Sequence, residues 1–87
     1  MINAKTKNEY SGSNYTALQA HALRFNSREW ATMKQWNELG YRVKPELNRE
    51  YVRLKFFKDE YDQVLGRYEK KLKYFNVFNK DQTEVIE

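Results

Sequence analysis

The sequence contains no cysteine, three glycines and a single proline among its 87 residues. The absence of cysteine excludes disulfide bonds and thiolate-metal sites, and nothing in the composition points to an oxidising compartment. The glycines, at positions 12, 40 and 66, are too few and too far apart for a G-x-G-x-x-G or phosphate-loop motif. No apolar run approaches the roughly 20 residues that a membrane-spanning helix requires, and the N-terminus lacks the apolar stretch of a signal peptide. We therefore expect a cytoplasmic protein without a membrane partner.

Catalytic and metal-binding patterns are also missing. His21 is the only histidine, no Ser-His-Asp or Cys-His set stands out, and the H-E-x-x-H motif of zinc proteases is absent. The carboxylates are scattered among cations, where solvated or paired roles are the default. The sequence therefore predicts a protein that is not an enzyme and that uses no cofactor or metal.

What the chain does have is positive charge and aromatic rings. Lysine and arginine total 16 against 12 acidic residues, which gives a formal net charge of +4, and there are seven tyrosines, five phenylalanines and two tryptophans. Cations are concentrated in segments 42–58 and 66–80, and acidic residues gather between them at Asp59, Glu60 and Asp62. A basic surface with an acidic rim suits a polyanionic partner. The alternative is an ordinary mixed-charge surface.

The most informative segment is 51–57, which reads Y-V-R-L-K-F-F. Side chains alternate between the two faces of a strand, so Val52, Leu54 and Phe56 form a core face. The other face carries two cations between two rings: Tyr51, Arg53, Lys55 and Phe57. Cations for phosphates beside rings for base stacking are what single-stranded nucleic acid requires of a surface. The same pattern also suits an ordinary solvated strand.

The rest of the chain contains recognisable helix and turn signals. An apolar stripe predicts a helix at about 15–25, with Asn14 as its cap. Thr32 and Gln35 form a capping box that starts a second helix, and Gly40 stands where a left-handed C-terminal cap belongs. Residues 41–44 are a strand candidate, followed by a turn at 45–48. Residues 59–70 fit a β-hairpin bend near 62–67, which we prefer, or a helical stripe.

These elements predict one α+β domain over 10–82, with a flexible segment at 1–9 and a tail at 83–87. We expect two N-terminal helices packed on one face of a small antiparallel β-sheet or hairpin made of 51–57 and 72–78. Trp30 and Trp36 are expected in the core, because tryptophan is highly buried on average. The strand's core face should be buried against the first helix and Trp36, through contacts of Val52, Leu54 and Phe56 with Leu18, Ala22 and Phe25.

The chain contains two sequence blocks, W-x-T-x-K-Q at 30–35 and V-F-N-x-x-Q at 77–82. Their sequences and the distance between them are similar to those of a known family. With the residues around them, they give a chain that resembles the N-terminal domain of ArdC-type antirestriction proteins from about Glu9 to Gln82. The matching residues are Tyr10, Gly12, Asn14, Ser27, Trp30, Thr32, Lys34, Gln35, Leu39, Gly40, Val43, Tyr74, Val77, Phe78, Asn79 and Gln82.

The resemblance implies a DNA-binding module from a phage or plasmid. It would bind single-stranded DNA with little sequence preference and serve anti-defence or DNA protection, without the metallopeptidase domain that such modules often precede. Double-stranded DNA is an alternative ligand, and a host restriction or CRISPR nuclease is an alternative partner that the protein would inhibit directly. The candidate DNA-binding residues are Arg42, Lys44, Arg49, Tyr51, Arg53, Lys55, Phe57, Lys71, Lys73 and Phe75.

The chain departs from the family's pattern in two places. Family members commonly carry a Gly- and Lys-rich turn after the position of Val43, and here that turn is Pro-Glu-Leu-Asn at 45–48. The amides of a glycine turn can cradle a phosphate, and this turn is poorer at doing so, although Arg49 can compensate. The segment between Phe57 and Lys71 is also short.

Overall fold

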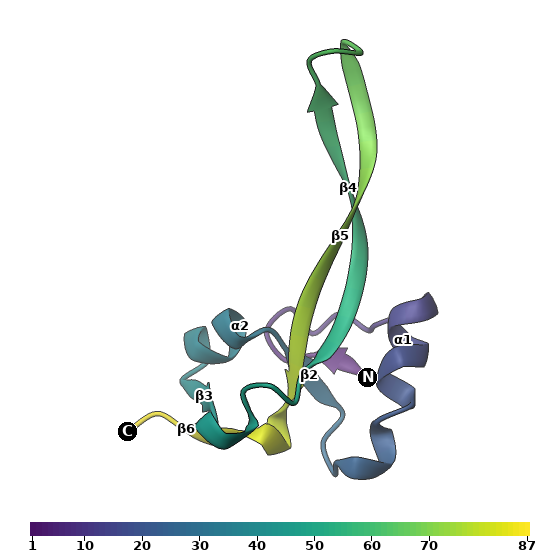
Figure 1. Cartoon of the computed structure of the whole chain (residues 1–87). Helices are drawn as coiled ribbons and strands as arrows, with labels where there is room; N and C mark the ends of the chain where they lie inside the picture. The colour runs from purple at the N-terminus through teal and green to yellow at the C-terminus, as the bar shows by residue number, and fades with distance from the viewer.

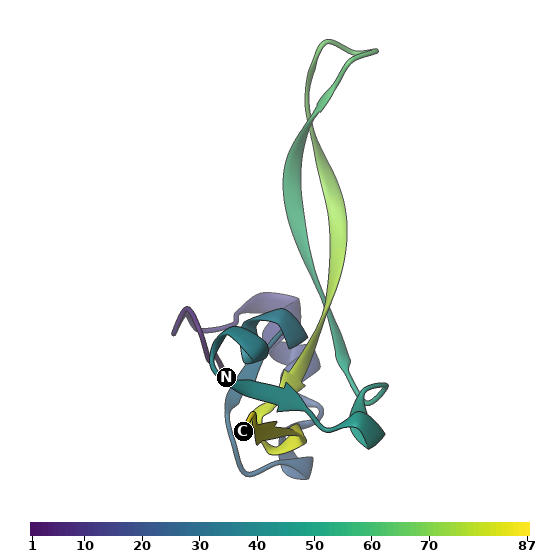
Figure 2. The ribbon, with the colours of Figure 1, turned by 90° about the vertical axis from the view of Figure 1, so that its left-hand side faces the viewer.

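The central sheet continues into a long β-hairpin that stands away from the rest of the chain (Figures 1 and 2). In the computed structural model, which describes residues 1–87, the sheet has the strand order β1-β2-β5-β4. Its strands are β1 (Ile2–Asn3), β2 (Glu29–Ala31), β4 (Val52–Asp62) and β5 (Arg67–Asn79). Strand β1 is parallel to β2, and the other pairs are antiparallel. The molecule measures 48 × 28 × 23 Å because the outer part of β4 and β5 extends as a projecting arm.

Shorter elements surround the base of this arm. Helix α1 spans Gly12–Gln19, helix α2 spans Met33–Glu38, and a two-stranded antiparallel sheet pairs β3 (Tyr41–Val43) with β6 (Thr83–Val85). Three single 3-10 turns, η1 (Ala22–Arg24), η2 (Pro45–Leu47) and η3 (Lys80–Gln82), complete the fold. No helix is both long and apolar enough to cross a lipid bilayer. The strand expected at 41–44 and the turn expected at 45–48 are confirmed.

The sheet is covered on both faces, which corrects the expected arrangement of two helices on one face. Trp30 and Ala31 are neighbours in β2 and therefore point to opposite sides, and both are fully buried. Trp30 packs with Leu18 of α1, whereas Ala31 packs with Trp36 of α2. The domain is α+β as predicted, but it has two small cores on a curled four-stranded sheet, not two helices on a small hairpin.

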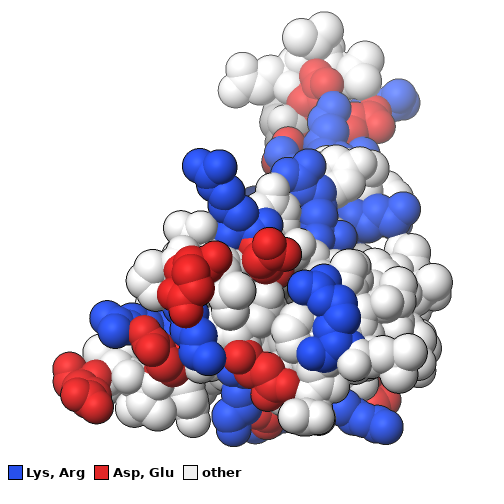
Figure 3. All heavy atoms as spheres, turned by 60° about the horizontal axis from the view of Figure 1, so that its bottom comes forward, with Lys and Arg blue, Asp and Glu red and all other residues white.

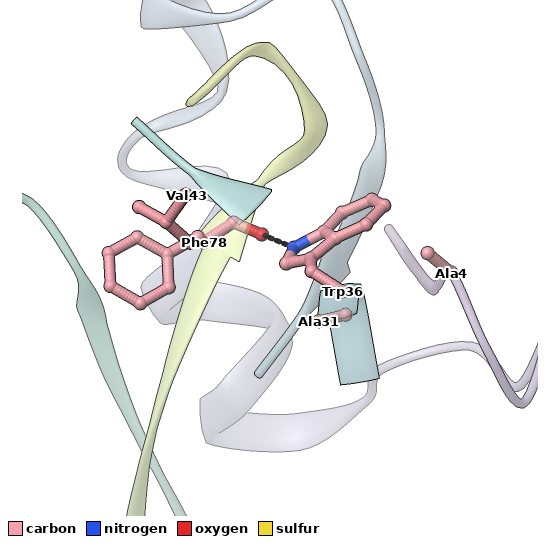
Figure 4. Close-up of a cluster of buried hydrophobic side chains, with 5 residues drawn as sticks. All are labelled: Ala4, Ala31, Trp36, Val43 and Phe78. Atoms are coloured by element: carbon pink, nitrogen blue, oxygen red, sulfur yellow. Dashed lines mark hydrogen bonds between the residues drawn. The ribbon is translucent and has the colours of Figure 1, made fainter. Parts of the chain in front are cut away.

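The core beside α2 contains Ala4, Ala31, Trp36, Val43 and Phe78 (Figure 4). The Trp36 indole Nε1–H donates to the Phe78 carbonyl oxygen at 2.9 Å, so the largest side chain of this core has its polar atom satisfied. The second core contains Leu18, Trp30, Val52, Leu54 and Val77. Both tryptophans are therefore core residues, as expected.

The core face of the 51–57 segment is only partly confirmed. Val52 and Leu54 are buried, but the exposed fraction of Phe56 is 44%. Phe56 lies where β4 leaves the body, so the cores end before they reach it. It packs edge-to-face against Phe75, with 5.6 Å between ring centroids. The expected contact of this face with Trp36 is wrong, since Trp36 lies in the other core.

The hairpin bend expected near 62–67 is confirmed, and the helical alternative for 59–70 is wrong. The register is continuous from Val52 opposite Val77 to Asp62 opposite Arg67. At the bend the Asp62 carboxylate accepts from the amides of Val64 and Leu65 at 2.9 and 3.0 Å. Gly66 supplies the positive φ of 65° that the turn requires.

Two boundaries near the N-terminus differ from the sequence prediction. Helix α1 begins at Gly12 and ends at Gln19, not at 15–25. Of the apolar stripe that predicted the longer helix, only Leu18 lies in α1 and is buried. Ala22 and Phe25 belong to the η1 turn and its C-terminal cap. Asn14 lies inside the helix and does not cap it. Residues 1–9, expected to be flexible, contribute strand β1 and the buried residues Asn3 and Ala4.

The capping box of α2 is confirmed. The Thr32 hydroxyl accepts from the Gln35 amide at 3.2 Å, and the Gln35 side-chain oxygen accepts from the Thr32 amide at 3.1 Å. The same Gln35 oxygen accepts from the side-chain amide of Asn3 at 2.9 Å. The box therefore also ties α2 to the N-terminal turn.

Thr32→Ala should lower the free energy of unfolding by about 1 kcal/mol, the usual loss when an N-cap hydroxyl is removed. Urea unfolding monitored by tryptophan fluorescence measures this change. Thr16→Ala is the matched control, because Thr16 is an exposed threonine of α1 that caps no helix. Equal unfolding midpoints for Thr32→Ala and wild type would show that the cap does not stabilise the fold.

Candidate nucleic-acid interface

The predicted alternation of side chains places four of the candidate residues together on one face of the arm. Tyr51, Arg53, Lys55 and Phe57 are all exposed, and the exposed fraction of Phe57 is 68%. The register sets Lys55 directly opposite Tyr74 of β5, whose ring is 60% exposed. We call these five residues, Tyr51, Arg53, Lys55, Phe57 and Tyr74, the Arg53 face.

The guanidinium of Arg53 lies beside aromatic rings, and neither cation of this face pairs with a carboxylate. The Arg53 guanidinium lies 6.0 Å from the ring centroid of Tyr51 and 6.0 Å from that of Tyr74. These are the outer limits of cation–π contact. Neither Arg53 nor Lys55 forms an ion pair, whereas Lys73 pairs with Glu60 at 2.8 Å and Arg67 with Glu69 at 2.7 Å elsewhere on the arm. The Arg53 face therefore keeps its positive charge available to an external anion.

Helix α1 fixes the edge of β4 at the centre of this face. The Asn14 side-chain amide donates to the Lys55 carbonyl oxygen at 2.8 Å, and its oxygen accepts from the Lys55 amide at 3.0 Å. Asn14 thus pairs with the strand edge as a neighbouring strand would. A hollow of about 270 Å³ lies between α1 and the arm, and its lining includes Ser13, Asn14, Arg53, Lys55 and Tyr74.

Three other candidates lie on the opposite face of the arm. Lys71 is opposite Lys58, Lys73 is opposite Phe56, and Phe75 is opposite Leu54 in the register. By strand alternation these side chains point away from Arg53 and Lys55. We call this surface, Phe56, Lys58, Lys71, Lys73 and Phe75, the Lys71 face. The structure therefore divides the predicted set between two faces of one ribbon.

Three lysines of the Lys71 face lie near the carboxylate of Glu60, which the register places opposite a second carboxylate, Glu69. The hydrogen bond from Lys73 lowers the pKa of Glu60, and the charges of Lys73, Lys58 and Lys71 lower it further. Glu60 is thus held as a carboxylate. It pairs with Lys73 while Glu69 pairs with Arg67, so Lys58 and Lys71 form no ion pair. Seen from below the arm, acidic and basic side chains alternate over the body, and basic side chains predominate along the lower arm (Figure 3).

The remaining candidates lie at the body. Arg42 is in β3 and pairs with Glu84 of β6 at 2.7 Å. Lys44 is half-buried and Arg49 is exposed, on either side of the η2 turn. The structure does not bring these three cations onto either face of the arm.

Sequence reasoning missed Tyr74 and Asn14 as parts of this surface. Tyr74 could have been found from the alternation Y-E-K-K-L-K-Y-F in β5, once that strand was paired with β4. Asn14 carried no such signal, because a polar residue before an apolar stripe is typical of a helix cap.

Comparison with known proteins identifies the family. A family model described as the N-terminal domain of anti-restriction factor ArdC matches residues 1–81. The chain belongs to this family, which confirms the resemblance that the sequence indicated. No curated protein is similar enough to match the chain.

Two solved structures are similar over the whole chain. Both are crystal structures of the antirestriction protein ArdC from the R388 plasmid. The metal-free structure is 27% identical with a TM-score of 0.76, and the Mn(II)-bound structure is 25% identical with a TM-score of 0.79. Each alignment covers 100% of this chain but only 33% or 35% of the ArdC chain. This chain therefore spans about a third of the length of those proteins.

Asn14→Ala should speed hydrogen exchange at the Lys55 amide by roughly 2- to 12-fold, the range that corresponds to a net hydrogen bond of about 0.5–1.5 kcal/mol. Native-state exchange followed by NMR measures this. Thr16→Ala is the control, because Thr16 lies on the same helix and bonds only to the Gly12 carbonyl, so exchange at the Lys55 amide should stay near that of wild type. Equal protection in wild type and Asn14→Ala would contradict a role for Asn14 in holding the strand edge.

Proposed function

We propose that this domain binds single-stranded DNA with little sequence preference, as a non-catalytic module serving antirestriction or DNA protection for a phage or plasmid. The observation that carries the proposal is the Arg53 face, where cations without carboxylate partners lie among exposed rings. Membership of the ArdC N-terminal family supports the antirestriction context.

The mechanism follows from the two kinds of group on the face. Arg53 and Lys55 are two residues, or about 6.6 Å, apart along β4, so both can contact the phosphates of one extended backbone. Phe57 and Tyr74 expose most of their ring surface, and the bases of a single strand can stack on them. In a duplex the faces of the bases are covered by the neighbouring base pairs in the stack, which favours a single strand as ligand. Stacking needs no particular base, so the binding would tolerate any sequence.

Replacing Arg53 and Lys55 together by alanine should weaken binding to all single-stranded oligonucleotides by a similar factor. Each lost phosphate contact should reduce the slope of log K against log salt by roughly 0.7. Fluorescence anisotropy with labelled 15-mers over a salt series measures both quantities. A parallel titration with a duplex of the same sequence tests the strand preference.

Lys5→Ala combined with Arg24→Ala is the matched control. It changes the net charge equally, but both cations lie on the body and pair with Glu38 and Glu50. Its affinity and salt slope should stay close to those of wild type. Binding by the Arg53 and Lys55 double variant that equals wild type would show that the ligand uses another surface.

Phe57→Ala or Tyr74→Ala should weaken binding by about 5- to 160-fold, which corresponds to about 1–3 kcal/mol for one stacked base. The salt slope should be retained, because no cation is removed. The same anisotropy series measures the affinity and the slope. Unchanged affinity in both variants would mean that these rings do not stack on bases.

A second candidate function is direct inhibition of a host defence protein. The tip of the arm favours it, because Val64 and Leu65 are 94% and 54% exposed and lie beside the exposed pair Tyr61 and Tyr68. Exposed apolar groups at the end of a projecting hairpin suit insertion into a protein pocket. If wild-type protein does not bind single-stranded DNA at low salt, this candidate replaces the first.

A further inference from the structure

A second hollow lies beside the Lys71 face, where the arm meets the N-terminal turn. Its volume is about 400 Å³, within the roughly 300–1,000 Å³ range of small-molecule sites. The lining includes the rings of Phe56 and Phe75 from the arm, and Thr6, Asn8, Glu9 and Tyr10 from the N-terminal segment. Aromatic rings on one wall and polar groups on another are the two elements that recognise a nucleobase.

The polar wall is rigid because the buried amide of Asn3 organises it. The Asn3 side-chain oxygen accepts from the amides of Lys5 and Thr6 at 2.9 and 3.0 Å. Its nitrogen donates to the Tyr10 hydroxyl and to the Gln35 side-chain oxygen, both at 2.9 Å. The turn is therefore fixed to helix α2 before any ligand arrives. Burial raises the pKa of Tyr10, against the opposing effect of the Asn3 hydrogen bond, so the Tyr10 hydroxyl stays protonated near neutral pH.

The groups at the rim of the hollow remain available. Asn8 uses its backbone in the bonds that hold the turn: its amide donates to the Thr6 hydroxyl at 3.2 Å, and its carbonyl accepts from the Asn3 amide at 2.8 Å. The Asn8 side-chain amide has no partner in the chain. It offers both a donor and an acceptor, so it can meet the polar edge of any of the four bases.

The ring wall is also free to receive a planar ligand. Phe56 is 44% exposed, although it belongs to the face of β4 that carries the core residues Val52 and Leu54. Phe56 and Phe75 meet edge-to-face at 66°. A base inserted between these rings and the N-terminal turn would remove exposed apolar surface from water and would stack on an aromatic ring.

Lysines lead from this hollow along the arm. Lys58 and Lys71 stand directly opposite each other in the register, and like charges in that position destabilise a strand pair. A neighbouring phosphate would relieve this repulsion. The nearby carboxylates of Glu60 and Glu69 form their ion pairs with Lys73 and Arg67, so Lys58 and Lys71 have no ion-pair partner. The lysines next to the hollow therefore form a positively charged surface that suits the phosphates of a nucleic-acid backbone.

We propose that the hollow between Phe56, Phe75 and the N-terminal turn 6–10 is a pocket for one nucleobase of a bound single strand, with Lys58 and Lys71 on the adjoining phosphates. This inference rests on the proposed single-stranded-DNA function and adds a discrete base site on the Lys71 face. A single DNA strand that contacts both the Arg53 face and the Lys71 face would wrap around the twisted hairpin.

Phe56→Leu tests the pocket, because leucine keeps an apolar side chain of similar size but cannot stack. Its affinity for an ordinary 15-mer should fall by about 5- to 160-fold, as expected when one stacked base is lost. Phe56→Trp should retain or raise the affinity. The same variants are titrated with a 15-mer of the same length whose sugars carry no bases. There Phe56→Leu and wild type should bind equally, because no base is present to enter the pocket.

The double variant Arg53→Ala with Lys55→Ala separates this proposal from the one on which it rests. It should weaken binding to the ordinary and the abasic 15-mers alike, because it removes phosphate contacts. If wild type and Phe56→Leu bind the ordinary 15-mer equally while this double variant binds weakly, the pocket is overturned and the proposed function stands. If wild type does not bind the ordinary 15-mer at low salt, both are overturned.

A loss in Phe56→Leu that is equally large on the abasic 15-mer would also overturn the pocket, since the effect would not depend on a base. Thermal unfolding of each variant provides the folding control. Phe56 lies outside both buried clusters, but its ring packs against Phe75. Phe56→Leu should therefore lower the unfolding temperature slightly, and the affinities are compared at a temperature where every variant is folded. Lowered affinity of the folded variant for the ordinary 15-mer alone supports the pocket.

Discussion

The pairing of β5 on both of its edges is the constraint on which the structure depends. Its C-terminal part pairs with β2 through Phe78 and Asn79, while Val77 and everything before it pairs with β4. Because side chains alternate, this one register sends Val77 to the core beside α1 and Phe78 to the core beside α2. The same alternation, continued outward, decides which side chains of the arm share a face. If β5 slipped by one residue against β4, Val77 would point to the side of α2 and Phe78 to the side of α1. All the other side chains of β5 in the arm would likewise move to the opposite face.

Local signals in the sequence were sufficient for several elements, but not for α1 and β1 or for the arrangement of the elements. The Thr32–Gln35 box, the strand at 51–57 and the bend near 62–67 are set by neighbouring residues, so they could be read from the chain. The placement of α1 and α2 on opposite faces depends on the partner of β2, which lies about 50 residues away at 78–79. The register between β4 and β5 likewise decides that Lys71, Lys73 and Phe75 lie on the face of the arm opposite to Arg53. This register is set by tertiary structure, not by neighbouring residues.

Several residues that carried the family resemblance have structural roles. Asn79 and Gln82 form a second capping box: the Asn79 oxygen accepts from the Asp81 amide at 2.9 Å, and the Gln82 oxygen accepts from the Asn79 amide at 2.8 Å. The Asn79 nitrogen also donates to the Ser27 carbonyl, and the Gln82 nitrogen to the Glu50 carbonyl. These buried amides therefore join the segments that precede β2 and β4 to the end of β5. A family pattern of this kind identifies the fold, and the surface that meets a ligand has to be argued from exposed groups.

The composition of the arm is not one that the stability of a two-stranded ribbon alone would require. Beyond Phe56 and Phe75 the hairpin has no core, and a two-stranded ribbon alone is at best marginally stable in water. The Tyr61–Tyr68 ring pair and the ion pairs of Lys73 and Arg67 support it, but exposed ion pairs contribute little. The opposed lysines 58 and 71 work against it. The register also opposes Glu60 and Glu69, but these form ion pairs with Lys73 and Arg67. An anionic ligand beside Lys58 and Lys71 would relieve their repulsion, so these two lysines weaken the free hairpin and would stabilise a complex with DNA.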